Sequence, residues 1–198
     1  MTAGDKLPER AASLIDFWFG PPGDPEREAH RPIWFKSTPE HDERLRNLFL
    51  ADYERAEAGA LTAWEQAPYS ALALLLLLDQ LPRNLFRDTP RAYATDAMAR
   101  AAADRALARG FEAAVPPVWR LFFYMPFHHS EELADQRRAV ELFATLPERD
   151  HRGALGRYGM RYVEVIERFG RFPHRNAILG RPSSAEEEAF LAERRKPS

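Results

Sequence analysis

The stretch LLLLLDQLPRN, residues Leu74 to Asn84, joins five consecutive leucines to a set of polar side chains. The six residues before it, PYSALA, extend the apolar run back to Pro68, and proline is favoured in the first turn of a helix. The pattern therefore predicts a helix over residues 68–81. Its leucines belong in the core of the protein.

Asp79 follows these leucines directly, so its carboxylate needs a partner or contact with water. Pro82 disfavours helical geometry at Leu81, and we expect the helix to end there. The loop beyond it would carry the polar residues Arg83, Asn84 and Arg87. Two interpretations of Asp79 follow: a buried carboxylate bound by Arg83 or by loop N–H groups, or a carboxylate at the floor of a pocket.

Prolines and glycines mark the ends of further helices. The pair Thr38-Pro39 opens a segment that Gly59 closes, and Thr89-Pro90 opens another that Gly110 closes. Similar signals predict helices over residues 8–19, 117–124, 157–169 and 185–195. No segment has the alternating pattern of a strand. We expect an all-α fold of about eight helices in a single domain over residues 1–198, with a frayed tail at 193–198.

Two helix starts show capping signals. Ser130 precedes one helix and would place Glu131 in the first turn, where acids complement the helix dipole. The last helix offers two alternative capping boxes, Ser183 with Glu186 or Ser184 with Glu187.

The composition limits the function. The chain of 198 residues has a net charge of -2 and no cysteine. The charge gives no field that would attract nucleic acid or an anionic membrane, and the longest apolar run is shorter than the roughly 20 residues of a membrane span. The lack of cysteine excludes disulfides, thiolate metal sites and a cysteine nucleophile. We expect a soluble, cytoplasmic protein.

Three apolar segments run into a proline and then a polar patch: DQLPRNLFRD (79–88), YMPFHHSEE (124–132) and RFGRFPHRNAILGR (168–181). We expect the patches to meet in space. Candidates for proton transfer are His129, His174, Asp79 and Glu131, because histidine titrates near neutrality and carboxylates serve as acids or bases. Candidates for ligand binding are Arg83, Asn84, Arg87, Arg171, Arg175 and Asn176.

The arginines among these candidates indicate an anion as the ligand. Guanidinium groups match carboxylate and phosphate geometry, whereas they repel a metal cation. No His-x-x-x-His or His-Glu-x-x-His spacing occurs, so we expect no metal, and no phosphate-binding loop points to a nucleotide cofactor. Ser130 fits a helix cap better than a nucleophile.

Two functions and one structural explanation stay open. The patches could line a pocket that binds or transforms a small anionic or polar metabolite. The helices could instead form an adaptor that grips a peptide of a protein partner on a concave face. The polar groups could also be an internal ion-pair network that joins helix ends. The sequence does not define a reaction.

Several motifs resemble those of a bacterial family known as domain of unknown function 924. They are DFWFG (16–20), LLDQLPRNLFRDT (77–89), FYMPFHHSEEL (123–133) and ERFGRFPHRNAILGR (167–181). The resemblance extends from about Asp16 to Leu191 and implies an all-helical fold similar to tetratricopeptide-repeat proteins. It implies no activity. Tyr162 stands where relatives commonly carry a histidine.

Overall fold

The computed structural model describes residues 7–146 and 152–194 of the chain, and every regular element in these ranges is helical. The prediction of an all-α fold is confirmed. Short 3-10 turns lie between several of the α-helices. The bounds of the α-helices are α1 Glu9–Phe19, α2 Pro39–Glu57, α3 Pro68–Leu75, α4 Leu81–Leu85, α5 Asp96–Ala108, α6 Leu121–His128, α7 Leu133–Ala144, α8 Arg152–Phe169 and α9 Ala185–Arg194.

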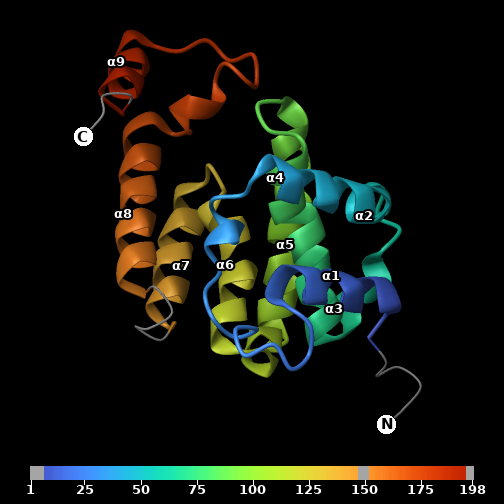
Figure 1. The fold of residues 1–198 in the computed structure, drawn as a ribbon. Coiled ribbons are helices and arrows are strands. Elements are labelled where there is room, and N and C mark those ends of the chain that lie inside the picture. The colour runs from blue at the N-terminus through green and yellow to red at the C-terminus, as the bar shows by residue number, and fades with distance from the viewer. Residues whose placement is uncertain (1–6, 147–151, 195–198) are drawn as a thin grey trace.

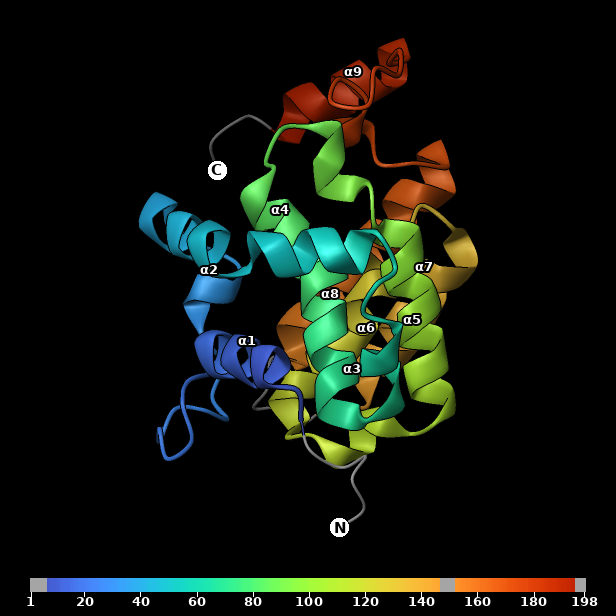
Figure 2. The ribbon, with the colours of Figure 1, turned by 90° about the vertical axis from the view of Figure 1, so that its right-hand side faces the viewer.

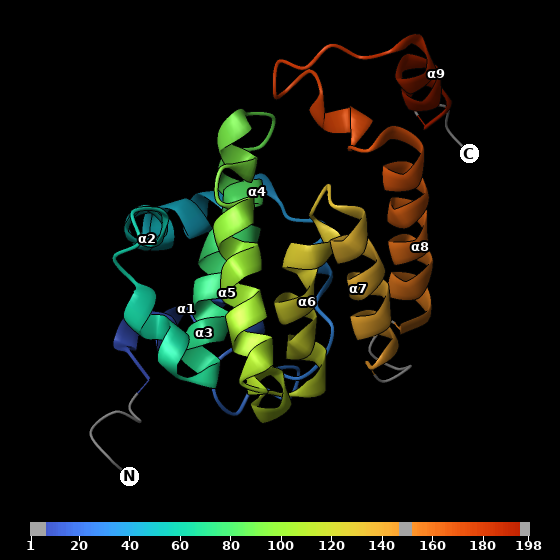
Figure 3. The ribbon, with the colours of Figure 1, turned by 180° about the vertical axis from the view of Figure 1, so that it is seen from behind.

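Four helices form a row in chain order. Figure 3 shows α5, α6, α7 and α8 side by side, and each contacts the next. The helix α3 packs against α5, α6 and α1. The helices α1 and α2 run across the axes of the helices in the row (Figure 2). The segment after α8 leads to α9 at one end of the bundle (Figure 1). This arrangement places the end of α6, the start of α5 and the segment after α8 at the same end.

The predicted core helix lies at the centre of the structure. The leucines at 74–78 are each at most 4% exposed, and burial of a leucine side chain contributes about 2 kcal/mol. Aromatic side chains fill the space beside it, with Phe19 stacked on Trp119 and in edge contact with Phe122. A smaller apolar cluster around Ile166 and Phe172 holds α8 to the segment that follows it.

The predicted end of the core helix at Leu81 is wrong. A π-helical segment, Leu76–Gln80, follows α3, and α4 continues through Pro82 to Leu85. The wider turn lets the Leu81 N–H donate to the carbonyl five residues back, at Leu76. Pro82 has no N–H to give, and the carbonyl of Leu78 accepts a hydrogen bond from the Thr95 hydroxyl instead, at 2.6 Å. Arg83 and Asn84 are therefore helical, and only Arg87 lies beyond the helix.

The predicted helix between Thr89 and Gly110 is also interrupted. A 3-10 turn covers Pro90–Tyr93, and α5 begins only at Asp96. The break turns Thr95 inward, where it is 1% exposed and bonded to the core helix. Tyr93 and Asp96 consequently face the same end of the bundle.

Other predicted bounds shift by a few residues. The helix expected over 117–124 begins as a 3-10 turn and continues as α6 to His128, and α8 begins five residues earlier than expected. The start of α7 lies at Leu133, so Glu131 precedes the first turn, although the Ser130 hydroxyl does accept the Glu132 N–H. Of the two capping boxes, Ser184 with Glu187 is confirmed by both of its hydrogen bonds.

Three expectations about the chain as a whole can be checked only against the described residues. Within the described ranges, none of the helices has the length and hydrophobicity that crossing a membrane requires. Glu193 and Arg194 belong to α9, and the rest of the predicted tail lies outside the described residues. The single domain over 1–198 stays a prediction.

Candidate functional site

Asp79 and His129 form a carboxylate–imidazole pair in the interior. Asp79 lies in the π-helical segment and is 1% exposed, and His129 follows the last residue of α6. Their closest atoms, Oδ1 of Asp79 and Nδ1 of His129, are 2.8 Å apart. The second carboxylate oxygen accepts from the Gln80 side chain at 2.5 Å. Both oxygens of the buried carboxylate are therefore bonded.

Arg83 joins this pair to a second carboxylate. Its Nη1 lies 3.3 Å from Oδ1 of Asp79 and 2.9 Å from Oδ1 of Asp96. Its Nη2 donates to Oδ2 of Asp96 at 3.0 Å. Continuation of the helix through Pro82 is what places Arg83 one turn after Asp79, on the same face.

Arg175 reaches the group from the 3-10 turn Pro173–Arg175 after α8. It is 6% exposed, donates from Nη2 to the main-chain oxygen of His129 at 2.9 Å and lies 3.4 Å from Oδ2 of Asp96. Its guanidinium lies over the rings of Tyr93 and Phe172, 4.5 and 4.7 Å from their centroids. Asp79, Arg83, Asp96, His129 and Arg175 together are called the buried charge network below.

The network sets the protonation of the pair. Burial favours the neutral acid form of Asp79, but contacts with His129 and Arg83 outweigh burial and lower the pKa of Asp79 to about 2. Burial and the charge of Arg83 lower the pKa of His129, against the opposing effect of Asp79. Near pH 7, Asp79 is therefore ionised and His129 is neutral.

This protonation state fixes the tautomer of His129. An ionised Asp79 only accepts hydrogen bonds, so Nδ1 of the neutral imidazole carries the proton and donates to it. The lone pair is then on Nε2. This is the arrangement that makes a histidine a hydrogen-bond acceptor or general base.

A cavity of about 380 Å³ lies beside His129. The start of α5 with the turn before it, the end of α6 with the residues before α7, and the segment after α8 line this open hollow, which we call the His129 pocket. Its lining is Pro90, Tyr93, Ala94, Asp96, Ala97, Arg100, Pro126, His129, Ser130, Glu131, Glu132, Arg175 and Leu179. Because His129 is 13% exposed and its Nδ1 is bound to Asp79, Nε2 is the nitrogen available to a molecule in the pocket.

Arg100 supplies a cation at the rim of this pocket. Its Nη1 donates to the Ser130 hydroxyl at 2.8 Å, and its Nε lies 3.4 Å from Asp135. The side chain is 34% exposed, so its guanidinium reaches solvent. The Ser130 hydroxyl itself donates to Asp135 at 2.8 Å, which directs its proton away from His129. Ser130 is thus a structural group, as the sequence indicates.

Glu131 lines the pocket, but hydrogen bonds to Arg181 and to the main chain of Phe172 occupy its carboxylate. Its two oxygens accept from Arg181 at 2.7 and 2.9 Å, and one also accepts the main-chain N–H of Phe172 at 2.7 Å. Burial opposes its ionisation, but these hydrogen bonds lower its pKa. Glu131 therefore anchors the segment after α8 and is not a free base.

The other predicted site residues lie outside the pocket. Asn84 and Arg87 both bind Asp42 of α2, at 2.7 and 3.0 Å. Arg171 holds Glu187 at the start of α9, and Asn176 bonds Ser183 and Arg181. The three patches do meet, through Asp79, Arg83, His129 and Arg175. Asn84, Arg87, Arg171 and Asn176 do not join them, because successive side chains of a helix or turn point in different directions.

His174 faces a separate cavity of about 800 Å³ between α8, α9 and the turn before Arg175. Burial, with the charges of Arg175 and Arg194, lowers the pKa of His174 to about 4. The main-chain direction places neighbouring His174 and Arg175 in different cavities. His174 therefore does not line the His129 pocket.

Sequence reasoning missed three residues that line the pocket beside His129, namely Tyr93, Asp96 and Arg100, and it missed Arg181, which binds Glu131. Arg181 ends a quoted motif, and Asp96 follows a threonine at a helix start. Asp96 and Arg100 have the i, i+4 spacing of residues on one helix face, which was the available signal. Among the described residues, no group of three or more His, Asp or Glu side chains is arranged to hold a metal ion.

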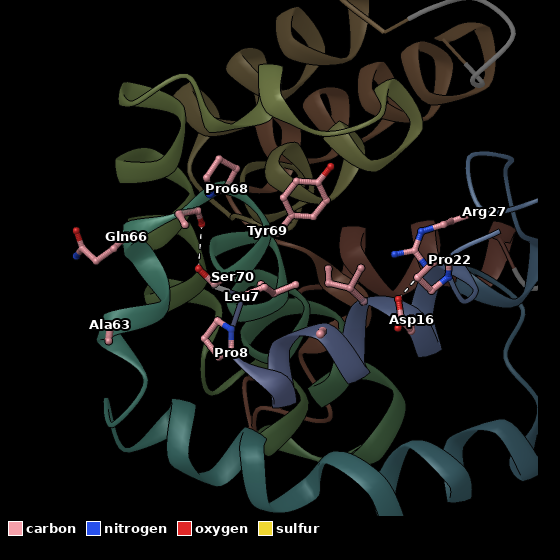
Figure 4. A pocket seen from close by; sticks show the side chains of 13 residues that line it. Leu7, Pro8, Asp16, Pro22, Arg27, Ala63, Gln66, Pro68, Tyr69 and Ser70 are labelled. Carbon is pink, nitrogen blue, oxygen red and sulfur yellow. Dashed lines mark hydrogen bonds and ion pairs between the residues drawn. The ribbon is translucent and has the colours of Figure 1, made fainter. Parts of the chain in front are cut away.

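A third hollow, of about 560 Å³, lies between α1 and the start of α3. Figure 4 shows the paired side chains of Asp16 and Arg27 toward one end and Gln66 toward the other, with Tyr69 between them. Oδ1 of Asp16 accepts from Arg27 at 2.8 Å. The described lining is largely apolar and includes no histidine, so it has no counterpart of the Asp79–His129 pair.

The fold and the site define an all-helical protein with a buried carboxylate–imidazole pair beside a small pocket. Residues 14–195 match the family described as bacterial protein of unknown function (DUF924), and the chain belongs to this family. It is also similar to a solved structure of a protein of unknown function from Agrobacterium tumefaciens. That likeness has 40% sequence identity, a TM-score of 0.82, and covers 92% of this chain and 97% of the other. No match is found among curated proteins.

Proposed function

We propose that the protein binds a small polar molecule in the His129 pocket, with Nε2 of His129 as its main hydrogen-bonding group. The 2.8 Å contact between Asp79 and Nδ1 of His129 carries the proposal, because it fixes the imidazole with its acceptor nitrogen available to the pocket. Asp79 is a positioning residue in this account. The cavity volume suits a metabolite of modest size.

The same arrangement supports proton transfer. A neutral histidine whose Nδ1–H is held by a carboxylate is a general base toward a ligand that presents an acidic hydrogen to Nε2. Arg100 pairs with Asp135, but its side chain is 34% exposed at the rim of the pocket, so it can also contact an anionic substituent. Arg83 and Arg175 are less exposed and are held by carboxylates and a main-chain oxygen. We propose a cytoplasmic location, which suits a chain without cysteine.

Thermal unfolding with a panel of phosphate, carboxylate and hydroxylated metabolites tests the proposal. A ligand at 100 times its Kd stabilises the folded state by about 2.7 kcal/mol, which raises Tm measurably. His129→Gln should abolish the shift, and His174→Gln should retain it because His174 faces another cavity. Equal shifts in the wild type and His129→Gln would place binding elsewhere.

The alternative function is an adaptor similar to tetratricopeptide-repeat proteins. The observation in its favour is the apolar hollow between α1 and α3, where Tyr69 is 38% exposed. Under this alternative, Tyr69→Ser weakens the association with a peptide partner, whereas His129→Gln does not. Under the proposed function, only His129→Gln changes ligand binding.

A further inference from the structure

The charges of the buried network cancel when His129 is neutral. Two carboxylates, Asp79 and Asp96, are matched by two guanidinium groups, Arg83 and Arg175, through contacts of 2.9 to 3.4 Å. Asp79 has both oxygens engaged, and Asp96 is shared by both arginines. A proton added to His129 would therefore leave one uncompensated positive charge in the interior.

The groups that face His129 from neighbouring elements offer little compensation. They are Asp79 before α4, Arg83 of α4, Tyr93 before α5, Asp96 and Arg100 of α5, His128 of α6, Glu131 and Glu132 before α7, and Arg175 after α8. Glu131 is bound to Arg181, and Arg100 is paired with Asp135. Glu132 is exposed, so water and salt screen its charge.

We propose that the ligand of the His129 pocket is a small anion and that it binds together with one proton, which is taken up by Nε2 of His129. This inference rests on the proposed function and narrows its ligand class. The proton comes from solvent, and Nε2–H then donates to the anion. No other bond forms or breaks.

Electrostatics gives the reason for the coupling. An anion in the pocket supplies the negative charge that balances a protonated His129. The ion pair that they form is partly shielded from water. Arg100 at the rim adds a second favourable contact, whereas Glu132 opposes the anion. A neutral polar molecule would bind without this favourable electrostatic interaction with protonated His129.

The test compares acetate with acetamide, which have similar size and shape but differ in charge. Nuclear magnetic resonance of histidine-labelled full-length protein follows the protonation of His129 during titrations at several pH values, with His129→Gln for assignment. We expect acetate to raise the apparent pKa of His129. Its affinity should fall about tenfold per pH unit above the pKa of the free protein, as uptake of one proton requires.

Two variants distinguish acetate binding in the His129 pocket from nonspecific effects of acetate on the protein. Arg100→Gln, at a partly exposed position, should weaken acetate binding several-fold without loss of folding, and His174→Gln should leave it unchanged. Acetate binding that is independent of pH, or acetamide binding as tight as that of acetate, would overturn the inference while leaving the proposed function intact. Failure of both probes to perturb His129 would overturn the anion class, and the metabolite panel would then decide the proposed function separately.

Discussion

Nδ1 of His129 lies 2.8 Å from Oδ1 of Asp79, although fifty positions separate the two residues in the chain. The carboxylate that ends the leucine run is thus bonded to a residue at the end of another helix, not to a following loop. Arg83, one turn later, extends the contact to α5 through Asp96. With Arg175, the buried charge network therefore ties four segments of the chain together as well as shaping the pocket: the π-helical segment with α4, the start of α5, the end of α6 and the turn after α8.

Arg83→Ala should lower the free energy of unfolding by about 3 to 5 kcal/mol, because it leaves Asp79 and Asp96 without their shared partner. Urea denaturation at pH 7 measures this loss. The matched control is Arg87→Ala, whose side chain is 52% exposed and pairs with Asp42. An exposed pair contributes about 0 to 1 kcal/mol, so equal losses in both variants would contradict a structural role specific to Arg83.

Thr95→Val should cost about 1 to 3 kcal/mol of stability. The substitution removes the hydroxyl that donates to the Leu78 carbonyl, which is left without an N–H partner beside Pro82. Thr89→Val serves as control, since the Thr89 hydroxyl bonds the Phe86 carbonyl at an exposed position. Similar melting temperatures for Thr95→Val and the wild type would show that the carbonyl has another partner.

Stability should fall as the pH drops below 6.5, partly because of His128. Burial, with the charge of His129, lowers the pKa of His128 to about 3. Below pH 6.5 the unfolded chain therefore binds a proton at His128 that the folded protein does not bind. His128→Phe preserves the stacking on Tyr162 and removes this titration. Between pH 4 and pH 6 the slope of unfolding free energy against pH should decrease by about 1.4 kcal/mol per unit. An unchanged slope would assign the acid sensitivity to other groups.

Ser184→Ala should destabilise α9 locally. The Ser184 hydroxyl accepts the Glu187 N–H, and Glu187 in turn accepts the Ser184 N–H and binds Arg171. Loss of such a cap costs about 1 kcal/mol. Hydrogen exchange should become about fivefold faster in α9 and remain unchanged in α3, as a 1 kcal/mol change in local opening requires. Uniformly faster exchange would instead indicate a global effect.

The fold was predictable because local signals agree with it. The cap at Thr38, the terminal Gly20 and Gly59, and the leucines of the core helix all act within one or two turns of the chain. The error at Pro82 has a long-range cause. The hydroxyl of Thr95, thirteen residues beyond it, donates to the carbonyl that Pro82 leaves free. In the π-helical segment the Leu81 N–H donates to the carbonyl five residues back instead of four, so the helix continues past Pro82.

The site was predictable only in part. Asp79, Arg83, His129 and Arg175 stood out because charged and titratable groups follow apolar helices, and the structure brings these four together. The direction of each side chain is not encoded in that pattern. Arg171 and Arg175 are four residues apart, yet the turn between them sends one to Glu187 and the other to Asp96.

The protonation state of His129 decides whether Asp79 positions its imidazole with Nε2 free to accept a hydrogen bond. Nitrogen-15 chemical shifts of the two ring nitrogens at pH 7 distinguish both neutral tautomers and the imidazolium. We predict a neutral ring with the proton on Nδ1 and an unprotonated Nε2 in the wild type, and a shift of the proton to Nε2 in folded Asp79→Asn. A wild-type ring with its proton on Nε2, or one charged at pH 7, would contradict the role assigned to the Asp79–His129 pair.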